Sequence, residues 1–204
     1  MQQARKVPRV CSKPHPMQID GSVLEGGGQI LRMSSAYAAL FGTEVHISKI
    51  RAGRSKPGLA AQHLESLRLV RDVSGGSLSN DRIGATSVSF APGQLKAGTF
   101  TADPGTAGAI TLMVQASLFP LLFAGSDCFC DLRGGTDVGY SPPLDFLCKI
   151  FLPTIQRMGV AVSFGKEQIR GFFPKGGGQV HLCVPAVIGT LKPIDLSERG
   201  EPAR

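Results

Sequence analysis

The chain has 204 residues, of which 42% are hydrophobic and 18% charged, enough apolar material for one large domain or two small ones. This composition is globular and excludes a fibrous or wholly disordered protein. Lysine and arginine number 22 against 15 acidic residues, and the formal net charge of +7 favours an anionic partner such as nucleic acid. The most apolar run, 109–124, is too short to cross a membrane, so no membrane partner is expected.

Residues 1–16 contain four bases, no acid and three prolines, which predicts a disordered basic tail. From residue 17 onward, short alternating segments are separated by longer segments with apolar residues at helical spacing. A first unit, 17–92, is expected to contain strands at 17–20, 44–50 and 83–90 and helices at 29–41 and 59–73.

The same order then returns in a second unit, 93–186. It is expected to contain strands at 98–102, 127–132, 160–164, 168–173 and 179–184 and helices at 109–118 and 145–158. Internal repetition on this scale indicates an α/β (α+β) fold of repeated units. Right-handed crossovers would place both helices of each unit on one face of its sheet. Residues 187–204 are more polar and read as a linker.

Two glycine-rich segments carry the main functional signal: Glu-Gly-Gly-Gly-Gln-Ile-Leu-Arg at 25–32 and Ile-Arg-Ala-Gly-Arg-Ser-Lys-Pro-Gly at 50–58. Glycine lets a backbone approach a ligand closely, and arginine matches the geometry of phosphate oxygens. The pattern predicts phosphate recognition on a nucleotide or nucleic acid, with a solvated basic face as the alternative. The chain has no Walker A pattern, so a P-loop ATPase is not supported.

The segments IDGSVLEGGGQILR (19–32) and IRAGRSKPGLAAQHL (50–64) resemble two signatures of the RNA 3′-terminal phosphate cyclase family. TAGAITLMVQ (106–115), RGGTDVGYSPPLDF (133–146), GFFPKGGGQV (171–180) and LSERG (196–200) follow in the family's order. The resemblance implies repeats of a four-stranded sheet with two helices, of which this chain would hold two of the family's three. It also implies that 187–204 begins an inserted domain.

The resemblance further implies an ATP-dependent enzyme of the ligase class that converts an RNA 3′-phosphate into a 2′,3′-cyclic phosphate during RNA processing. The family adenylylates a histidine, transfers AMP to the RNA phosphate and lets the neighbouring 2′-hydroxyl displace AMP. The implied cofactors are ATP and Mg²⁺ or another divalent metal, and the implied partner is RNA with a 3′-phosphate end. No stable protein partner is expected. The implied location is the nucleus (nucleoplasm), with the cytoplasm as a further location.

Residue roles follow from the same matches. Glu25 is expected to bind the divalent metal, Gln62 to contact RNA, and Gln115 and Pro142 to bind ATP, with Pro142 packing on the adenine ring. Four bases are expected to hold the RNA and ATP phosphates: Arg32, Arg51, Arg54 and Lys56. From the residues alone, Gln115 could equally be a satisfied core glutamine, because a buried amide needs partners. Pro142 could equally be an ordinary loop proline.

No histidine matches the family's nucleophile. His15, His46 and His181 fall in the tail and in strands, and His63 lies in a signature at a position that the family does not adenylylate. We therefore expect the chain to lack the segment with the nucleophile and to be inactive or nearly so alone. One alternative is a non-catalytic short form that binds RNA or nucleotide. Another is the cyclase-like ribosome-assembly factor, but that branch departs from the two signatures that this chain keeps.

Overall fold

The structure, a computed structural model, describes residues 15–195 and 197. The segment 1–14 of the expected basic tail lies outside the described residues. Among the described helices, none combines the length and the apolar character needed to cross a membrane.

The first unit is a four-stranded sheet with two helices. Its elements are β1 (Met17–Asp20), α1 (Gly28–Phe41), β2 (Val45–Ser48), α2 (Ala61–Ser74), β3 (Ser77–Ser79) and β4 (Val88–Ala91). The strand order is β1-β2-β4-β3, with β1 and β2 parallel and the other pairs antiparallel. Both helices end at glycines in the left-handed conformation, Gly42 and Gly75, which removes the steric cost that a side chain would meet there.

The second unit repeats this topology. Its elements are β5 (Thr99–Ala102), α3 (Ile110–Leu122), β6 (Cys128–Gly134), α4 (Leu144–Phe146), the π-helical turn η1 (Leu147–Phe151), α5 (Leu152–Gln156), β7 (Ser163–Ile169) and β8 (Gly178–Val184). The order is β5-β6-β8-β7, with β5 and β6 parallel and the other pairs antiparallel. Strand order and direction are the same in both units, which confirms the predicted α/β fold of repeated sheet-and-helix units.

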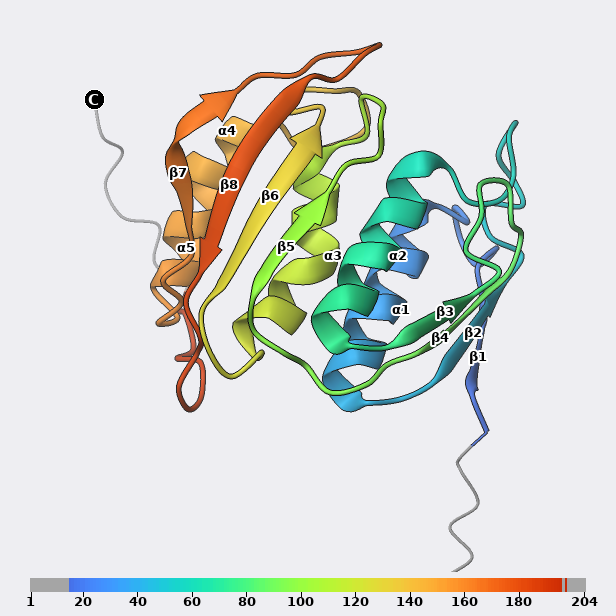
Figure 1. Cartoon of the computed structure of the whole chain (residues 1–204), viewed down its shortest axis with the longest axis horizontal. Helices are drawn as coiled ribbons and strands as arrows, with labels where there is room; N and C mark the ends of the chain where they lie inside the picture. Colours follow the sequence, from blue (N-terminus) through green and yellow to red (C-terminus); the bar gives the residue numbers. More distant parts are fainter. Residues whose placement is uncertain (1–14, 196, 198–204) are drawn as a thin grey trace, which may run out of the picture.

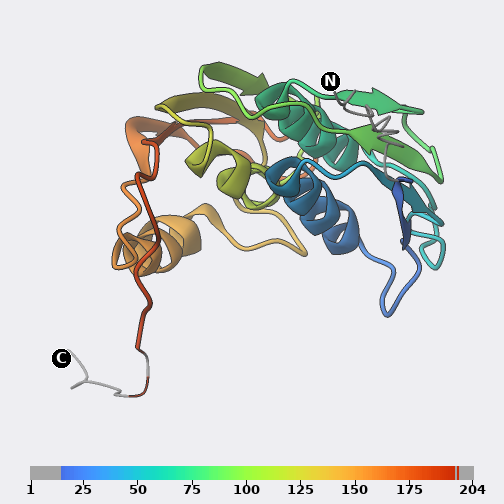
Figure 2. The same ribbon diagram turned by 90° about the horizontal axis from the view of Figure 1, so that it is seen from below.

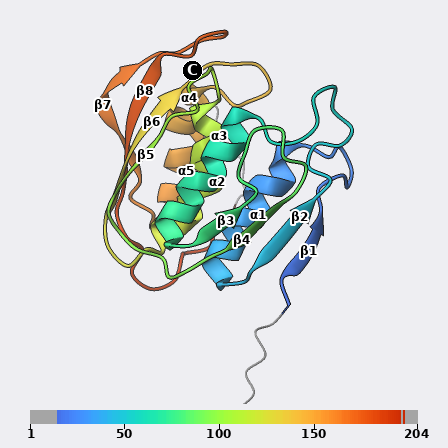
Figure 3. The same cartoon turned by 45° about the vertical axis from the view of Figure 1, so that its right-hand side comes forward.

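The two sheets form the outer layers, and helices α1, α2 and α3 lie between them (Figures 1 and 3). Helix α3 contacts both α1 and α2, so the helical faces of the two units meet. Leu69 and Val73 of α2 belong to the core of the second unit, and Ala116 of α3 belongs to the core of the first. The two cores are therefore joined, and residues of both units can contribute to one site.

Three expected strands need correction. The segment 83–90 forms strand only from Val88, because residues 84–86 instead bond to Ile50 and Leu59 in the loop after β2. The segments 160–164 and 168–173 are not two strands, since a single strand, β7, runs through both with a register irregularity between Phe164 and Gln168. Strand β3 was not expected, because its three residues Ser-Leu-Ser are too short to show a period.

Helices α1 and α3 and the helical segment α4–η1–α5 lie on the side of the molecule seen from below (Figure 2). The exposed apolar side chains on α1, on α3 and its C-cap, and on α4 and η1 are Tyr37, Phe41, Phe119, Phe123, Phe146 and Ile150. Tyr37 and Phe41 stack with ring centroids 6.1 Å apart. Apolar patches of this kind mark ligand grooves or interaction surfaces.

Candidate phosphate and nucleotide site

The two glycine-rich loops follow the parallel strands β1 and β2 and lead into the N-termini of α1 and α2. Asp20, at the end of β1, ties them together. Its carboxylate accepts a hydrogen bond from the Ser22 N–H (2.9 Å) in the first loop and pairs with the Lys49 ammonium (2.7 Å) in the second. Loops beyond the carboxyl ends of parallel strands are where α/β sheets bind ligands, so this edge is the first candidate for a site.

Both loops hold non-glycine residues in the left-handed backbone region. These are Leu24 (φ 55°), Lys49 (φ 51°) and Arg51 (φ 53°). Each such residue costs about 1–3 kcal/mol and persists only where its surroundings enforce it, commonly at ligand-binding sites. Strained backbone is therefore present in both glycine-rich loops, which points to a functional role for this edge of the sheet.

Arg32 occupies the centre of the site. It projects from the second turn of α1, is only 8% exposed, and donates from Nε to the Oε1 of Gln115 on α3 at 3.0 Å. Burial lowers the pKa of Arg32, and among the described residues no carboxylate lies within 4 Å of its guanidinium. A buried cation without a carboxylate is costly, so this position favours an anionic ligand.

His63, in the first turn of α2, packs against Arg32 and Gly28. A Cβ on Gly28 would overlap His63 Nε2 and would lie 3.0 Å from Arg32 Nη1. The Ala60 N–H donates to His63 Nδ1 (3.3 Å), which favours the neutral tautomer with its proton on Nε2. Desolvation, and then the charges of Arg51 and Arg32, lower the pKa of His63 to about 4. His63 therefore stays neutral at pH 7 and presents Nε2–H as a donor.

The remaining bases lie further out. Arg51 donates from Nη1 to the Gly58 carbonyl at 2.8 Å, and burial followed by the charge of Arg54 lowers its pKa. Arg54 lies 3.8 Å from the Glu25 carboxylate and within 3.5 Å of the position a Gly27 Cβ would occupy. Lys56 is exposed on the same loop. The bases thus run from the buried Arg32 outward to the rim.

An apolar cavity of about 200 Å³ lies beside this cluster, between α1, α3 and the helix that begins at α4. Gln115 and Pro142 line it together with Met33, Phe119 and Phe146. The Pro142 carbonyl accepts a hydrogen bond from Thr111 Oγ1 (2.8 Å), which fastens its loop to α3. A cavity with mainly apolar walls and a single side-chain amide suits a heteroaromatic base.

A second hollow, of about 470 Å³, lies over the first glycine loop. It is lined by Glu25, Gly26, Gly27 and Met33 among others, and Met33 also lines the apolar cavity. The two hollows therefore adjoin at Met33. One ligand could place a base in the apolar cavity and its phosphates over the glycine loop.

Comparisons with known proteins place this site in a family. The family model described as RNA 3′-terminal phosphate cyclase matches residues 23–197. The chain belongs to the RNA 3′-terminal phosphate cyclase family. A curated relative of that name from Archaeoglobus fulgidus is 45% identical over 168 residues, which cover 82% of this chain and 51% of the relative. One from Desulfurococcus amylolyticus is 41% identical over 184 residues, which cover 90% of this chain and 51% of the relative. One from Trichormus variabilis is 43% identical over 196 residues, which cover 91% of this chain and 55% of the relative. The chain spans about half the length of these relatives.

The structure brings most of the site residues expected from the cyclase resemblance to one edge. It excludes one alternative: Gln115 is not a core glutamine but an exposed residue of α3, bonded to Arg32 across 83 residues of sequence. Gln62 lies at the α2–α3 junction, where its Oε1 accepts the Ala109 N–H at 2.9 Å. The proposed RNA contact of Gln62 would therefore have to use its amide nitrogen.

Three residues that contribute to this site were not predicted from the sequence. No role was predicted for His63. Its position offered a signal, because a side chain in the first turn of a helix, three residues after Ala60, can bond back to the Ala60 N–H. Asp20 follows an expected strand and precedes the glycine loop, which is a recognisable position for a loop anchor. Met33 gave no signal, because its helical spacing reads simply as core.

The metal expectation rests on Glu25. Its side chain is 91% exposed, and among the described residues no group of three or more His, Cys, Asp or Glu could hold a metal ion. Mg²⁺ commonly uses one or two carboxylates together with substrate phosphates, so a single carboxylate beside a phosphate hollow fits that mode. It does not fit a metal held by protein ligands alone.

The low pKa of His63 makes a testable contribution to stability. Its pKa is about 4 in the folded chain, below the ordinary histidine pKa of 6.5, so the unfolded chain binds the proton more readily. Stability should therefore fall as pH drops from about 6.5 toward 4, by up to about 3 kcal/mol from this group. Urea unfolding at pH 7 and pH 5 should show a smaller difference in His63→Gln than in the original chain. Equal differences would contradict the role of His63 as a neutral, desolvated group.

Proposed function

We propose that this chain forms the ATP- and phosphate-binding part of an ATP-dependent RNA 3′-terminal phosphate cyclase. The observation that carries the proposal is Arg32, a buried cation held between Gln115 and His63 at the meeting point of the two glycine loops. The names of the relatives support cyclisation of an RNA 3′-terminal phosphate. In the proposed reaction the terminal 3′-phosphate is activated by AMP, and the 2′-hydroxyl then attacks the phosphorus and releases AMP.

In this proposal the adenine of ATP lies in the apolar cavity, and Pro142 forms part of its wall. The phosphates lie over the first glycine loop, where Glu25 would hold a Mg²⁺ ion that neutralises their charge. Arg32, Arg51 and the Nε2–H of His63 surround the RNA 3′-phosphate. Arg54 and Lys56 act from the rim. Catalysis by such a site consists of positioning two phosphates and neutralising their charge.

One observation favours a binding-only role for the chain by itself. Among the histidines that the structure describes, His63 alone lies at the site, and its tautomer presents a proton and no lone pair there. His46 is bonded to Ser89 within the first sheet, and His181 lies on the outer face of the second. A histidine nucleophile supplied from outside the described residues would reconcile this arrangement with cyclase chemistry.

The test compares two oligoribonucleotides of one sequence, ending in a 3′-phosphate or a 3′-hydroxyl. Fluorescence anisotropy should show at least about tenfold tighter binding of the phosphorylated form, because the terminal phosphate gains charge-assisted hydrogen bonds. Calorimetry should also detect ATP binding that requires Mg²⁺. Equal affinity for both RNA ends, together with no ATP binding, would overturn the proposed function.

A further inference from the structure

The segment 171–180, Gly-Phe-Phe-Pro-Lys-Gly-Gly-Gly-Gln-Val, is a sequence motif to which the site above assigns no role. It forms the connection between β7 and β8 and the start of β8, at the top of the molecule in Figure 1. Its glycines are partly explained by packing. A Cβ on Gly171 would overlap backbone atoms of Gly134 and Gly178, so three chain segments meet there without side chains. Packing does not explain the exposed residues of the motif.

The tip of this connection is held in place by backbone contacts. Phe172 and Gly176 exchange two backbone hydrogen bonds, of 3.1 and 2.7 Å. Gly176 adopts φ 80°, and a Cβ there would lie 2.7 Å from the Thr106 carbonyl oxygen in the loop after β5. The Thr136 N–H donates to the Gly171 carbonyl at 2.8 Å. The tip is therefore a fixed feature whose side chains keep a defined position.

A polar cleft of about 420 Å³ lies beneath this tip, and we name it the hairpin cleft. Its lining residues are Asp103, Gly105, Thr106, Arg133, Gly134, Lys175, Gly177, Gly178 and Gln179. Arg133 and Lys175 bring two positive charges to the cleft, and Arg133 lies 3.5 Å from the carboxylate of Asp131 beside it. The one carboxylate in the lining itself, that of Asp103, already accepts the Gly105 N–H at 2.7 Å. Glycine backbone lines the remaining wall. This combination suits a phosphate of a polynucleotide, because the phosphate can approach the protein backbone closely where glycines line the wall.

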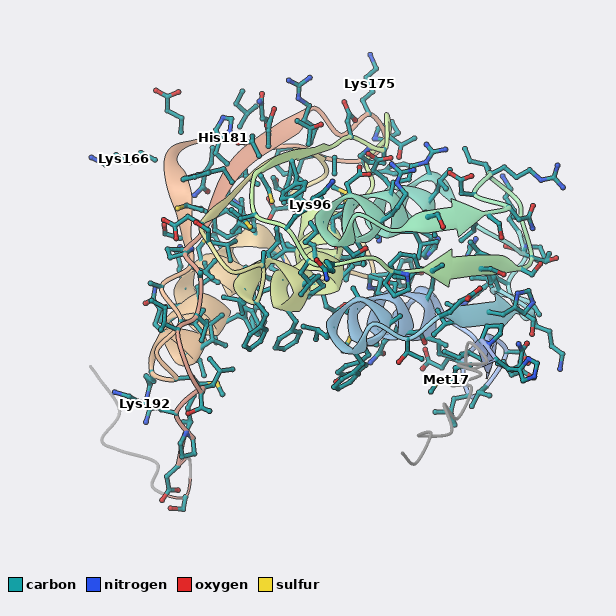
Figure 4. The ribbon with its side chains drawn as sticks, turned by 60° about the horizontal axis from the view of Figure 1, so that its bottom comes forward. Met17, Lys96, Lys166, Lys175, His181 and Lys192 are labelled. Atoms are coloured by element: carbon teal, nitrogen blue, oxygen red, sulfur yellow. The ribbon has the colours of Figure 1, made fainter. Side chains whose placement is uncertain are left out.

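Two exposed aromatic residues lie in the same hairpin tip as Lys175, which lines the cleft. Phe173 is 81% exposed and Phe172 is 57% exposed, and Pro174 alone separates Phe173 from Lys175 in the chain. Figure 4 shows Lys175 projecting from the end of the hairpin into solvent. Exposed aromatic rings beside a basic groove are how proteins hold single-stranded nucleic acid, with bases stacked and phosphates neutralised.

One loop separates the hairpin cleft from the phosphate site. Asp103, Gly105 and Thr106 of this loop line the cleft, and further along the same loop the Ala109 N–H donates to Gln62 Oε1 at 2.9 Å. A Cβ on Gly108 would lie 3.1 Å from the Gln62 Cβ. A polynucleotide whose end lies at Arg32 and Gln62 can therefore cross this loop and reach the cleft.

We propose that the hairpin cleft binds the internucleotide phosphates just upstream of the 3′-terminal phosphate of a single-stranded RNA, with a base stacked on Phe173. This inference rests on the proposed function, because that function places the 3′-terminal phosphate at Arg32. It adds that the chain recognises a stretch of RNA strand as well as its terminal phosphate. The substrate is then an oligonucleotide, and a lone 3′-phosphorylated nucleotide should bind much less tightly.

The test measures binding of a 3′-phosphorylated hexaribonucleotide and of a nucleoside 3′,5′-bisphosphate to variants of the hairpin. Lys175→Ala and Phe173→Ala should each weaken hexamer binding, by about fivefold or more for the aromatic residue. Lys175→Ala should also lower the slope of log affinity against log salt by about 0.7. Neither variant should change binding of the bisphosphate or of ATP with Mg²⁺. Lys166→Ala is the matched control, since Lys166 is an exposed lysine of β7 outside the cleft (Figure 4).

Unchanged hexamer affinity and salt dependence in Lys175→Ala and Phe173→Ala would overturn the inference. So would an equal loss for the hexamer and the bisphosphate, since that loss would indicate a general defect. Failure of the proposed function looks different, because the unaltered chain would then bind 3′-phosphorylated and 3′-hydroxyl hexamers equally and would not bind ATP. A Lys175→Ala defect in that case would still support strand binding in the cleft.

Discussion

Gly28→Ala should weaken binding of 3′-phosphorylated RNA by roughly 10- to 100-fold while leaving the chain folded. The added methyl group overlaps the His63 imidazole and comes within 3.0 Å of the Arg32 guanidinium. Both donors must then move away from the position where we place the phosphate. The backbone itself is not strained by alanine here, because Gly28 is the first residue of α1 with no positive φ. Anisotropy with the phosphorylated oligonucleotide measures the loss, and circular dichroism checks the fold.

Gly139→Ala is the matched control. Gly139 lies in the loop before Pro142, has no positive φ, and a Cβ there would meet no atom within 4 Å. It should bind RNA as the unaltered chain does. Wild-type affinity in Gly28→Ala would contradict the placement of the phosphate between Arg32 and His63.

Arg32→Met should separate stability from binding. Loss of the charge-assisted hydrogen bonds should reduce affinity for the 3′-phosphate by roughly 10- to 100-fold. Stability should nevertheless be unchanged or higher by about 1 kcal/mol, because the arginine is buried beside His63 and Arg51 without a carboxylate, and methionine fills similar space. Urea unfolding without ligand measures this second effect.

Arg32→Lys tests the geometry of the same position. A lysine keeps the charge but cannot present the planar fork of donors and cannot hold Gln115 through Nε while facing a phosphate. We expect it to recover little of the lost affinity. Arg157→Ala, at an exposed arginine that caps α5, should change neither binding nor stability appreciably. A strongly destabilised Arg32→Met with normal RNA affinity would show that Arg32 is a structural residue.

The spacing of apolar residues predicted α1 and α2 well, because a helix that buries one face places its apolar residues at helical spacing. Helix α1 follows the expected 29–41 segment within one residue, and α2 follows 59–73 within two. Helix α3 runs four residues beyond its expected end at 118, past Pro120, because Leu121 and Leu122 are fully packed in the core of the second unit. Tertiary packing, which the sequence does not display, decides where such a helix ends.

The site was only partly predictable for a related reason. Arg32, Arg51 and Arg54 stand out as bases beside glycines, and that local signal is sufficient to nominate them. The bond between Arg32 and Gln115 depends on how the two units pack, so no pattern near either residue could show it. The same packing explains why Gln115 is exposed although its neighbours on α3 are buried.

The most direct test of the site is a titration of the ¹⁵N-labelled chain with Mg²⁺ and ATP, followed by amide NMR. If the base lies in the apolar cavity and the phosphates lie over the glycine loop, resonances should shift together in 24–33, 111–119 and 142–147. These segments line the two hollows that adjoin at Met33. Shifts confined to other parts of the chain, or no shifts at millimolar ATP, would contradict a composite nucleotide site built from both units.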